Sequence, residues 1–375
     1  MFGTYRLILA LLVLVTHIGK VEVYGGVAVW GFFMLSGFLI TGVLNRRYGF
    51  TKLGLVQFAW SRVLRLYPAY WLSTALTYVA VRMLASRIDP LIVNDRLAVP
   101  SSLRDQLASF FILGNTFLGL GRAELSLSPS AWAIDVELLL YVVSAVWLSR
   151  TPSNTSRMVV SMALLFVPCW LVGKLLLGKG YSDIANQMTY SFLPVALFPY
   201  AIGAWLWHHQ KRFSNFHATS TRLLDGALLL IVCASGLSCV SITLAYLVSL
   251  PILAMVTAML AGVDHVGKYR KMDDFLGLMS YPIYLTHWLC ALLVVWVFPI
   301  GMNDSIYQLN KEGMAVFTAF GFALVTLVTL LLSAGIAVGF EVPIERRRRE
   351  FANHLAKMMV DRERGPERVP TRPKV

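Results

Sequence analysis

The sequence predicts an all-α fold, a polytopic transmembrane bundle of about ten helices, from its composition and from the continuity of its apolar runs. Of 375 residues, 57% are hydrophobic and only 14% are charged, whereas soluble domains carry about 25% charged residues. Several runs reach the roughly 20 apolar residues that a helix needs to cross a bilayer. Because these runs are continuous, they do not fit a transmembrane β-barrel, whose strands alternate over short segments.

Ten apolar segments have the length and hydropathy of membrane-spanning helices. The first lacks a following small-residue cleavage site and contains a histidine, so we interpret it as a retained helix rather than a signal peptide. In chain order the segments are Tyr5–Ile18, Gly26–Leu44, Pro68–Leu84, Trp132–Leu148, Met158–Leu177, Phe192–Trp207, Leu223–Cys239, Ile242–Ala261, Phe275–Phe298 and Met314–Phe340.

The net charge of +13 does not indicate a nucleic-acid-binding protein, because the basic residues gather in short loops and in the C-terminal tail. With a cytoplasmic N-terminus, all five cytoplasmic junctions are basic, as the positive-inside rule requires. These junctions are Arg46–Arg47, Arg150–Arg157, Lys211–Arg212, Lys268–Lys271 and Arg346–Arg349. We therefore expect a membrane domain over residues 1–345, followed by a basic cytoplasmic tail, 346–375, that is partly disordered.

Two segments are not expected to span the membrane. Thr51–Leu66 is amphipathic and basic, which predicts a separate cytoplasmic helix at the membrane interface. Arg87–Ser130 is the longest outer connection, and its apolar stretch Leu107–Leu120 is short enough to be re-entrant or to act as a lid.

The four cysteines lie in apolar segments, with neither metal-ligand spacing nor a disulfide framework. We expect Cys169, Cys233, Cys239 and Cys290 to be buried small hydrophobic side chains. The chain has no Walker loop, HExxH, GxSxG or CxxC motif. We therefore expect no metal and no permanently bound cofactor.

Arg6 and His17 lie in the first apolar run, eleven residues apart. In a helix they share nearly one face and are roughly 16 Å apart along the axis. An ionisable side chain inside a membrane is a functional candidate, and an imidazole can act as a general base near neutral pH. The alternatives are a structural histidine and an arginine that anchors topology.

Arg62 and Arg65 form an R-x-x-R pair on one helical face. Two guanidinium groups at a membrane surface suit a phosphate-bearing ligand. Contact with lipid headgroups is the alternative.

Two further apolar segments carry polar residues. Asp135 and Glu137, near the start of the fourth segment, are two residues apart and do not share a face, so they are not a paired acid and base. Asp135 suits a first helical turn, whereas Glu137 lies deeper, with Tyr141 one turn further on.

In the ninth segment, Ser280, Tyr284 and His287 form one polar stripe around Pro282. A purely structural, hydrogen-bonded stripe is the alternative to a functional one. Gly37 in the second segment is expected to permit close helix approach.

Six motifs, in a consistent order from about Arg6 to Pro343, resemble the acyltransferase type 3 family of membrane proteins. They are Arg6 with His17, Phe32–Ile40, Arg62–Trp71, Trp132–Tyr141, Ser280–Trp288 and Glu341–Pro343. The resemblance implies ten core helices in a bacterial inner (plasma) membrane, with both termini cytoplasmic. It also implies transfer of an acyl group, usually acetyl, from cytoplasmic acyl-CoA to a carbohydrate hydroxyl, such as that of an O-antigen or exopolysaccharide unit.

The resemblance carries the family's R-x10-H, R-x-x-R and W-S-x-x-x-E residues over to this chain. It implies that His17 and Glu137 are catalytic and that Arg6, Arg62 and Arg65 hold acyl-CoA, the donor substrate. Ala133 and Leu138 depart from the family pattern, where a serine and a second carboxylate are usual. The hypothesis assigns the acceptor side, or the orientation of His17, to Trp132, Asp135, Tyr141, Ser280, Tyr284 and His287.

The partners expected on this basis are acyl-CoA, a carbohydrate or lipid-linked glycan and membrane lipids. A proton-coupled transporter is the competing class, because the same intramembrane groups could relay protons. Many transporters contain inverted repeats, and the sequence contains no recognisable internal repeat.

Overall fold

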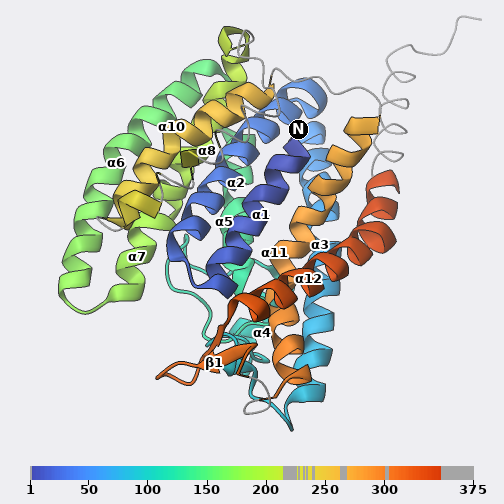
Figure 1. The fold of residues 1–375 in the computed structure, drawn as a ribbon. Helices are drawn as coiled ribbons and strands as arrows, with labels where there is room; N and C mark the ends of the chain where they lie inside the picture. Colours follow the sequence, from blue (N-terminus) through green and yellow to red (C-terminus); the bar gives the residue numbers. More distant parts are fainter. Residues whose placement is uncertain are drawn as a thin grey trace, which may run out of the picture.

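The computed structural model describes residues 2–213, 226, 229–230, 233, 235–238, 241–261, 268–299 and 304–347. These residues form a helical bundle with one small antiparallel hairpin (Figure 1). The long helices are α1 (Phe2–Gly19), α2 (Glu22–Val43), α3 (Lys52–Leu84), α5 (Trp132–Val146), α6 (Pro152–Gly178), α8 (Leu193–His208), α10 (Ile242–Ala261), α11 (Lys268–Val297) and α12 (Ala319–Ile336). The short elements are α4 (Leu103–Phe111), α7 (Ser182–Tyr190), β1 (Tyr307–Leu309) and β2 (Ala315–Phe317).

Among the described residues, eight helical segments are long and apolar enough to cross a membrane. They match eight of the ten predicted spans, so the predicted fold class, a polytopic all-α bundle, is confirmed. The predicted span Pro68–Leu84 is the second half of α3, which is not one of the eight. The predicted span Leu223–Cys239 lies largely outside the described residues.

The prediction of a separate interfacial helix over Thr51–Leu66 is wrong. That segment continues through Pro68 into the following apolar segment, forming the single helix α3. Proline usually marks a helix boundary because it disfavours helical geometry in the residue before it. In a helical membrane protein, neighbouring groups can satisfy the backbone around a proline. Two residues before the proline, the Tyr281 hydroxyl of α11 donates to the Leu66 carbonyl at 3.1 Å, which joins α11 to α3.

The last predicted span also begins too early. Residues after Met314 form strand β2, which pairs with β1, and α12 begins only at Ala319. Thr318 caps this helix, since its Oγ1 accepts a hydrogen bond from the Gly321 amide at 3.2 Å.

The apolar stretch in the outer connection forms the end of α4 followed by a loop. The helix ends at Phe111 because Ile112 and Gly114 adopt positive φ angles of 67° and 92°. Aromatic side chains of α3 bind this end: the Tyr67 hydroxyl donates to the Phe111 carbonyl at 2.5 Å, and the Tyr70 hydroxyl to the Ser109 carbonyl at 2.6 Å. The connection is therefore fixed against the bundle.

Glycines allow the central helices to pack closely. A Cβ atom at Gly37 of α2 would lie 2.0 Å from the Tyr200 carbonyl oxygen of α8, and one at Gly203 would lie 1.9 Å from the Met34 carbonyl oxygen. The predicted role of Gly37 in close helix approach is confirmed. On the other side, Gly3 of α1 meets Gly277 of α11, which brings these two helices together. The α1–α11 contact aligns Arg6 and His17 with the polar stripe of α11.

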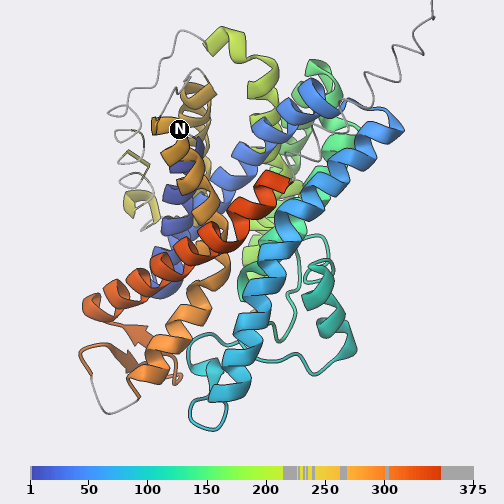
Figure 2. The ribbon, with the colours of Figure 1, turned by 90° about the vertical axis from the view of Figure 1, so that its right-hand side faces the viewer.

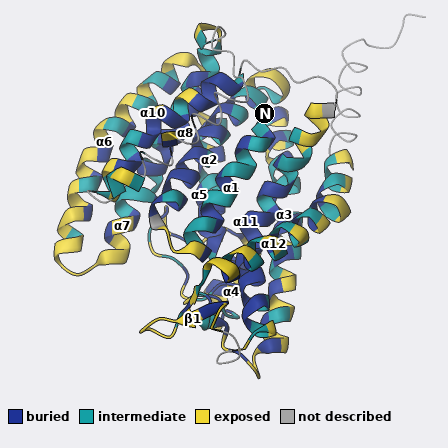
Figure 3. Cartoon of the chain, in the orientation of Figure 1, coloured by how far each residue is buried: buried dark blue, intermediate teal, exposed yellow. Residues whose placement is uncertain are grey.

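The two ends of the bundle differ. Figures 1 and 2 show the N-terminus and the turn between α2 and α3 at one end, and α4, the hairpin and the α6–α7 turn at the other. Between the ends, α6 presents an outer face that is largely exposed (Figure 3), including Val160, Leu164 and Leu171. An exposed apolar surface of this kind suits contact with lipid.

Candidate active site

A cavity of about 290 Å³ lies between α1, α2, α3, α5 and α11. It gathers seven of the residues singled out in the sequence. These are Arg6, Arg62, Arg65, Glu137, Tyr141, Ser280 and Tyr284. The remaining wall is mostly apolar, with Val29, Phe32, Phe33, Leu39, Ile40, Val43, Leu66, Ala133 and Ile134. The helix packing thus brings together residues that lie more than two hundred positions apart in the chain.

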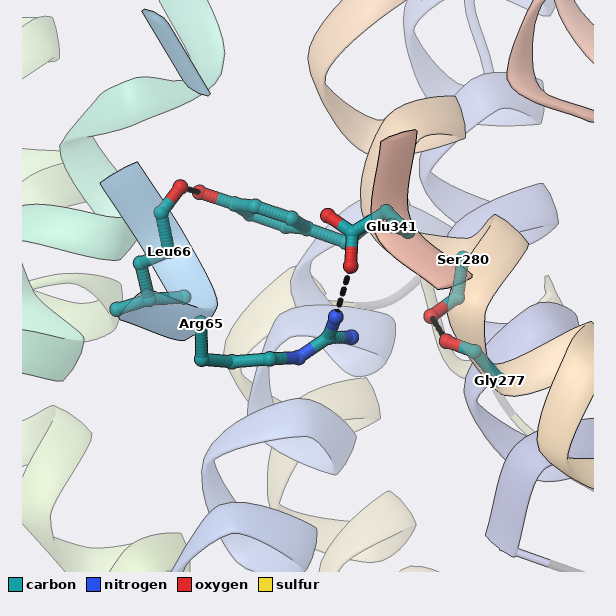
Figure 4. Close-up of polar contacts among 6 residues, drawn as sticks. Arg65, Leu66, Gly277, Ser280 and Glu341 are labelled. Atoms are coloured by element: carbon teal, nitrogen blue, oxygen red, sulfur yellow. Dashed lines mark hydrogen bonds and ion pairs between the residues drawn. The ribbon is translucent and has the colours of Figure 1, made fainter. Parts of the chain in front are cut away.

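One part of the cavity is strongly cationic. Arg62 and Arg65 lie three residues apart on α3 and both line it, as their predicted common face requires. Arg65 forms an ion pair with Glu341, which lies in the π-helical turn after α12 (Figure 4). The Arg65 guanidinium also lies 5.9 Å from the centre of the Tyr281 ring. Glu341 was part of a quoted motif but had no predicted role.

Glu137 faces this cationic region. Its Oε1 accepts hydrogen bonds from the Ser36 hydroxyl at 2.5 Å and from the Tyr141 hydroxyl at 2.6 Å. The expected neighbour one turn along α5 is therefore present, whereas Ser36 was missed. Its only signal in the sequence is a hydroxyl within the apolar run of α2, which is also compatible with simple packing.

His17 and His287 form a hydrogen-bonded pair. His17 Nδ1 lies 2.8 Å from His287 Nε2, and His287 Nδ1 lies 3.2 Å from the Ile283 carbonyl oxygen. A carbonyl only accepts, so we assign the His287 proton to Nδ1, which leaves Nε2 as the acceptor from His17 Nδ1–H. In this neutral pair, His17 Nε2 keeps its lone pair and can take a proton.

Tyr284 connects the histidine pair to the cavity. The two histidines are not among the residues that line the cavity, but Tyr284 is, and its ring centre lies 6.4 Å from that of His287. The Tyr284 hydroxyl donates to the Ser130 carbonyl at 2.5 Å. Trp288 stacks on His17 with ring centres 5.0 Å apart, which fixes the imidazole from another side.

Trp132 and Asp135 lie outside the cavity. Asp135 is 2% exposed, and its Oδ2 accepts from the Thr116 amide at 2.8 Å and the Thr116 hydroxyl at 3.0 Å. It therefore ties the outer connection to α5. Trp132 packs against Tyr190 and lies beneath Arg122, whose Cζ is 4.6 Å from the ring centre. Sequence reasoning missed Arg122, because a single arginine in a long loop carries no pattern.

The cysteines and acidic residues form no second centre in the part of the chain that the structure describes. Cys169 and Cys290 are buried, as expected, Cys233 is partly buried, and the thiols of all three are free. Cys239 lies outside the described residues. No group of three His, Cys, Asp or Glu side chains among the described residues is placed to hold a metal ion.

Comparison with known proteins gives one family and two distant relatives. The model of a family described as "Acyltransferase domain" matches residues 2–336. An O-acetyl transferase of Shigella phage Sf6 is 26% identical over 241 residues, which cover 60% of this chain and 67% of the relative. An uncharacterized protein of Haemophilus influenzae is 28% identical over 178 residues, 45% of this chain and 68% of the relative. No solved structure matches.

Proposed function

Since the chain belongs to the acyltransferase family that matches residues 2–336, we propose that it moves an acetyl group from cytoplasmic acyl-CoA to a carbohydrate hydroxyl. One observation carries this proposal: a single cavity joins three arginines to a tyrosine beside a histidine pair. The likeness to a phage O-acetyl transferase supports acetyl as the acyl group and oxygen as its acceptor.

The arginine-lined part of the cavity supports binding of the CoA phosphates. Arg6, Arg62 and Arg65 come from two helices and line one space. Guanidinium groups bind phosphate through several charge-assisted hydrogen bonds. The five basic junctions support a cytoplasmic location for these arginines.

The apolar wall supports binding of the pantetheine arm. It leads from the arginines towards Tyr284, and the distance from Arg6 to His17 along α1 is roughly 16 Å at 1.5 Å per residue. An extended pantetheine arm spans a comparable length. The thioester then lies near the histidine pair while the phosphates stay with the arginines.

His17 acts as the general base in the proposed reaction. The acceptor O–H gives its proton to His17 Nε2 as the oxygen attacks the thioester carbonyl carbon. The C–S bond breaks, and the leaving CoA thiolate takes the proton from the imidazolium, which gives CoA–SH and restores neutral His17. His287 is a positioning residue, because its Nε2 accepts from His17 Nδ1–H and so keeps the reactive nitrogen free.

Glu137 contributes a fixed negative charge among the three arginines. Its carboxylate is held by Ser36 and Tyr141, and its charge acts on Arg6. It keeps the guanidinium groups oriented before CoA binds. Ser280 and Tyr284 shape the path of the acyl group beside it.

The decisive experiment uses the purified full-length protein in lipid nanodiscs with radiolabelled acetyl-CoA. We expect release of CoA with label transfer to glycan or, more slowly, to water. Replacing Arg62 and Arg65 with Ala should weaken acetyl-CoA binding by roughly tenfold or more per arginine.

The matched control replaces Arg46 and Arg47 of the π-helical turn after α2. Neither lines the cavity, so their loss should leave acetyl-CoA affinity unchanged. Proton-coupled flux of a solute without any thioester cleavage would contradict the proposed function and favour a transporter.

A further inference from the structure

Arg122 is a partly buried cation that the proposed reaction does not use. It lies in the connection between α4 and α5, where its Cζ is 4.6 Å from the centre of the Trp132 ring. Its Nε is buried and has no hydrogen-bond partner among the described residues. Burial lowers the pKa of the guanidinium, yet an arginine stays protonated in proteins. A buried guanidinium N–H without an acceptor is costly unless a ligand supplies one.

The backbone around Arg122 is braced on both sides. The Gly121 amide donates to Gln187 Oε1 at 2.6 Å, and the Ala123 amide donates to the Asn115 carbonyl at 3.0 Å. Two residues before Gly121 in the chain, the Gly119 carbonyl accepts a hydrogen bond from the Ser191 hydroxyl at 2.7 Å. The guanidinium is therefore presented from a fixed position.

The charge of Arg122 acts on groups around the histidine pair. Its charge acts on Tyr190 and Tyr284, and also on His17. The one carboxylate whose charge acts on Arg122 within the described chain is that of Asp183, which is 77% exposed and ion-paired with Arg96 at 3.6 Å. The local field is thus positive and close to the proposed base.

A second buried polar atom lies around the same tyrosine. The Ser130 carbonyl accepts the hydrogen bond from Tyr284, while the Ser130 Oγ is buried without a hydrogen-bond partner in the described part of the chain. Two buried polar atoms without a hydrogen-bond partner near one cavity-lining tyrosine are unusual, since buried polar groups are nearly always hydrogen-bonded.

We propose that Arg122 and Ser130 form an acceptor subsite beside the histidine pair and outside the arginine-lined cavity, and that Arg122 binds an anionic oxygen group of the acceptor. The inference rests on the proposed function. A guanidinium matches the two oxygens of a carboxylate or phosphate. The anionic group is either the carboxylate of an acidic sugar or the diphosphate that links a glycan to a lipid carrier.

The test measures acetyl transfer by the full-length protein in nanodiscs with three acceptors. They are a free oligosaccharide containing glucuronic acid, its neutral glucose counterpart, and the neutral oligosaccharide attached to a polyprenyl diphosphate. Arg122→Gln should raise KM for an anionic acceptor roughly ten- to a hundredfold. Its kcat, its acetyl-CoA affinity and its slow thioester hydrolysis should stay near those of the wild type.

Two further variants separate binding from folding. Arg122→Lys keeps the charge and should recover part of the affinity for the anionic acceptor. Arg96→Gln removes the same charge from the neighbouring segment between α3 and α4, where Arg96 donates to the Ala123 carbonyl at 3.4 Å and pairs with Asp183. It should leave KM unchanged.

The outcomes are distinct. An effect confined to the glucuronic acid acceptor identifies a carboxylate, and one confined to the lipid-linked acceptor identifies the diphosphate. Equal KM changes for charged and neutral acceptors, or a change in kcat alone, would overturn the subsite. Absence of both transfer and thioester hydrolysis in the wild type would contradict the proposed function itself.

Discussion

At the scale of single residues, the proposed reaction depends on one atom, the Nε2 of His17. His17→Gln keeps hydrogen-bonding capacity but cannot take a proton at neutral pH. We expect turnover to fall by about 10²–10⁴-fold, with acetyl-CoA affinity nearly unchanged, because the proposal assigns CoA binding to the arginines of the cavity, which His17 does not line. Turnover should be compared with that of His209→Gln, whose ring contacts Trp205 through its carbonyl and its indole and does not line the cavity. Near-normal turnover of the His17 variant would mean that His17 is not the general base, and Glu137 or His287 would then be the candidates.

The partner of His17 gives a second test at this scale. His287→Gln offers a carbonyl oxygen that can still accept from His17 Nδ1–H, whereas His287→Leu offers none. We expect the Leu variant to lose roughly tenfold or more in kcat and the Gln variant to recover much of it. Steady-state kinetics with acetyl-CoA would measure both. Equal activity of the two variants would remove the positioning role that the 2.8 Å contact implies.

Residue patterns predicted much of this site, and the reason is physical. Charged groups within apolar runs are rare enough to stand out, which is why Arg6, His17 and Glu137 could be found. Arg122 and Ser36 could not, because an arginine in a loop or a hydroxyl in an apolar run has a common structural use. Their positions follow from the folded connection and from helix packing, which no local pattern encodes.

At the scale of elements, hydropathy predicted where helices exist better than where they begin and end. A single continuous apolar run, such as that of α2, clearly predicts a helix. The amphipathic segment before Pro68 looked separate, but α3 continues through the proline as one helix. The hairpin before α12 was missed because three-residue strands carry too little periodicity to be recognised.

The contact between α2 and α8 supports a prediction of its own. A Cβ at Gly37 would lie 2.0 Å from the Tyr200 carbonyl oxygen, so Gly37→Ala must push the helices apart. Overpacking of this kind costs about 1–3 kcal/mol, and we expect a lower midpoint of thermal unfolding in detergent. Gly335→Ala in α12 is the matched control, since a Cβ there meets nothing within 4 Å. Equal midpoints for the two variants would mean that α2 and α8 can move apart without a loss of stability.

At the scale of the whole molecule, the arrangement of the helices creates the proposed donor and acceptor regions. Because α1 and α11 run side by side, Arg6 shares the cavity with Ser280 of α11, and His17 pairs with His287 further along that helix. The arginine-lined cavity and the braced outer connection therefore approach the same histidine pair from different elements. Sequence reasoning could predict each helix separately. It could not predict which helices are neighbours, since helix packing depends on three-dimensional complementarity.

The same arrangement makes the predicted topology testable. The five basic junctions predict that the end with the N-terminus and the α2–α3 turn faces the cytoplasm. Ser153 at the start of α6, exposed in the structure, should then be labelled only from inside, and Lys179 in the α6–α7 turn and Asp304 before the hairpin from outside. Single cysteines at these positions, in a variant whose four native cysteines are replaced with serine, can be probed with a membrane-impermeant maleimide on intact and permeabilised cells. Labelling of Ser153→Cys on intact cells would show that the orientation is opposite to the predicted one. The arginine-lined cavity would then face away from cytoplasmic acyl-CoA.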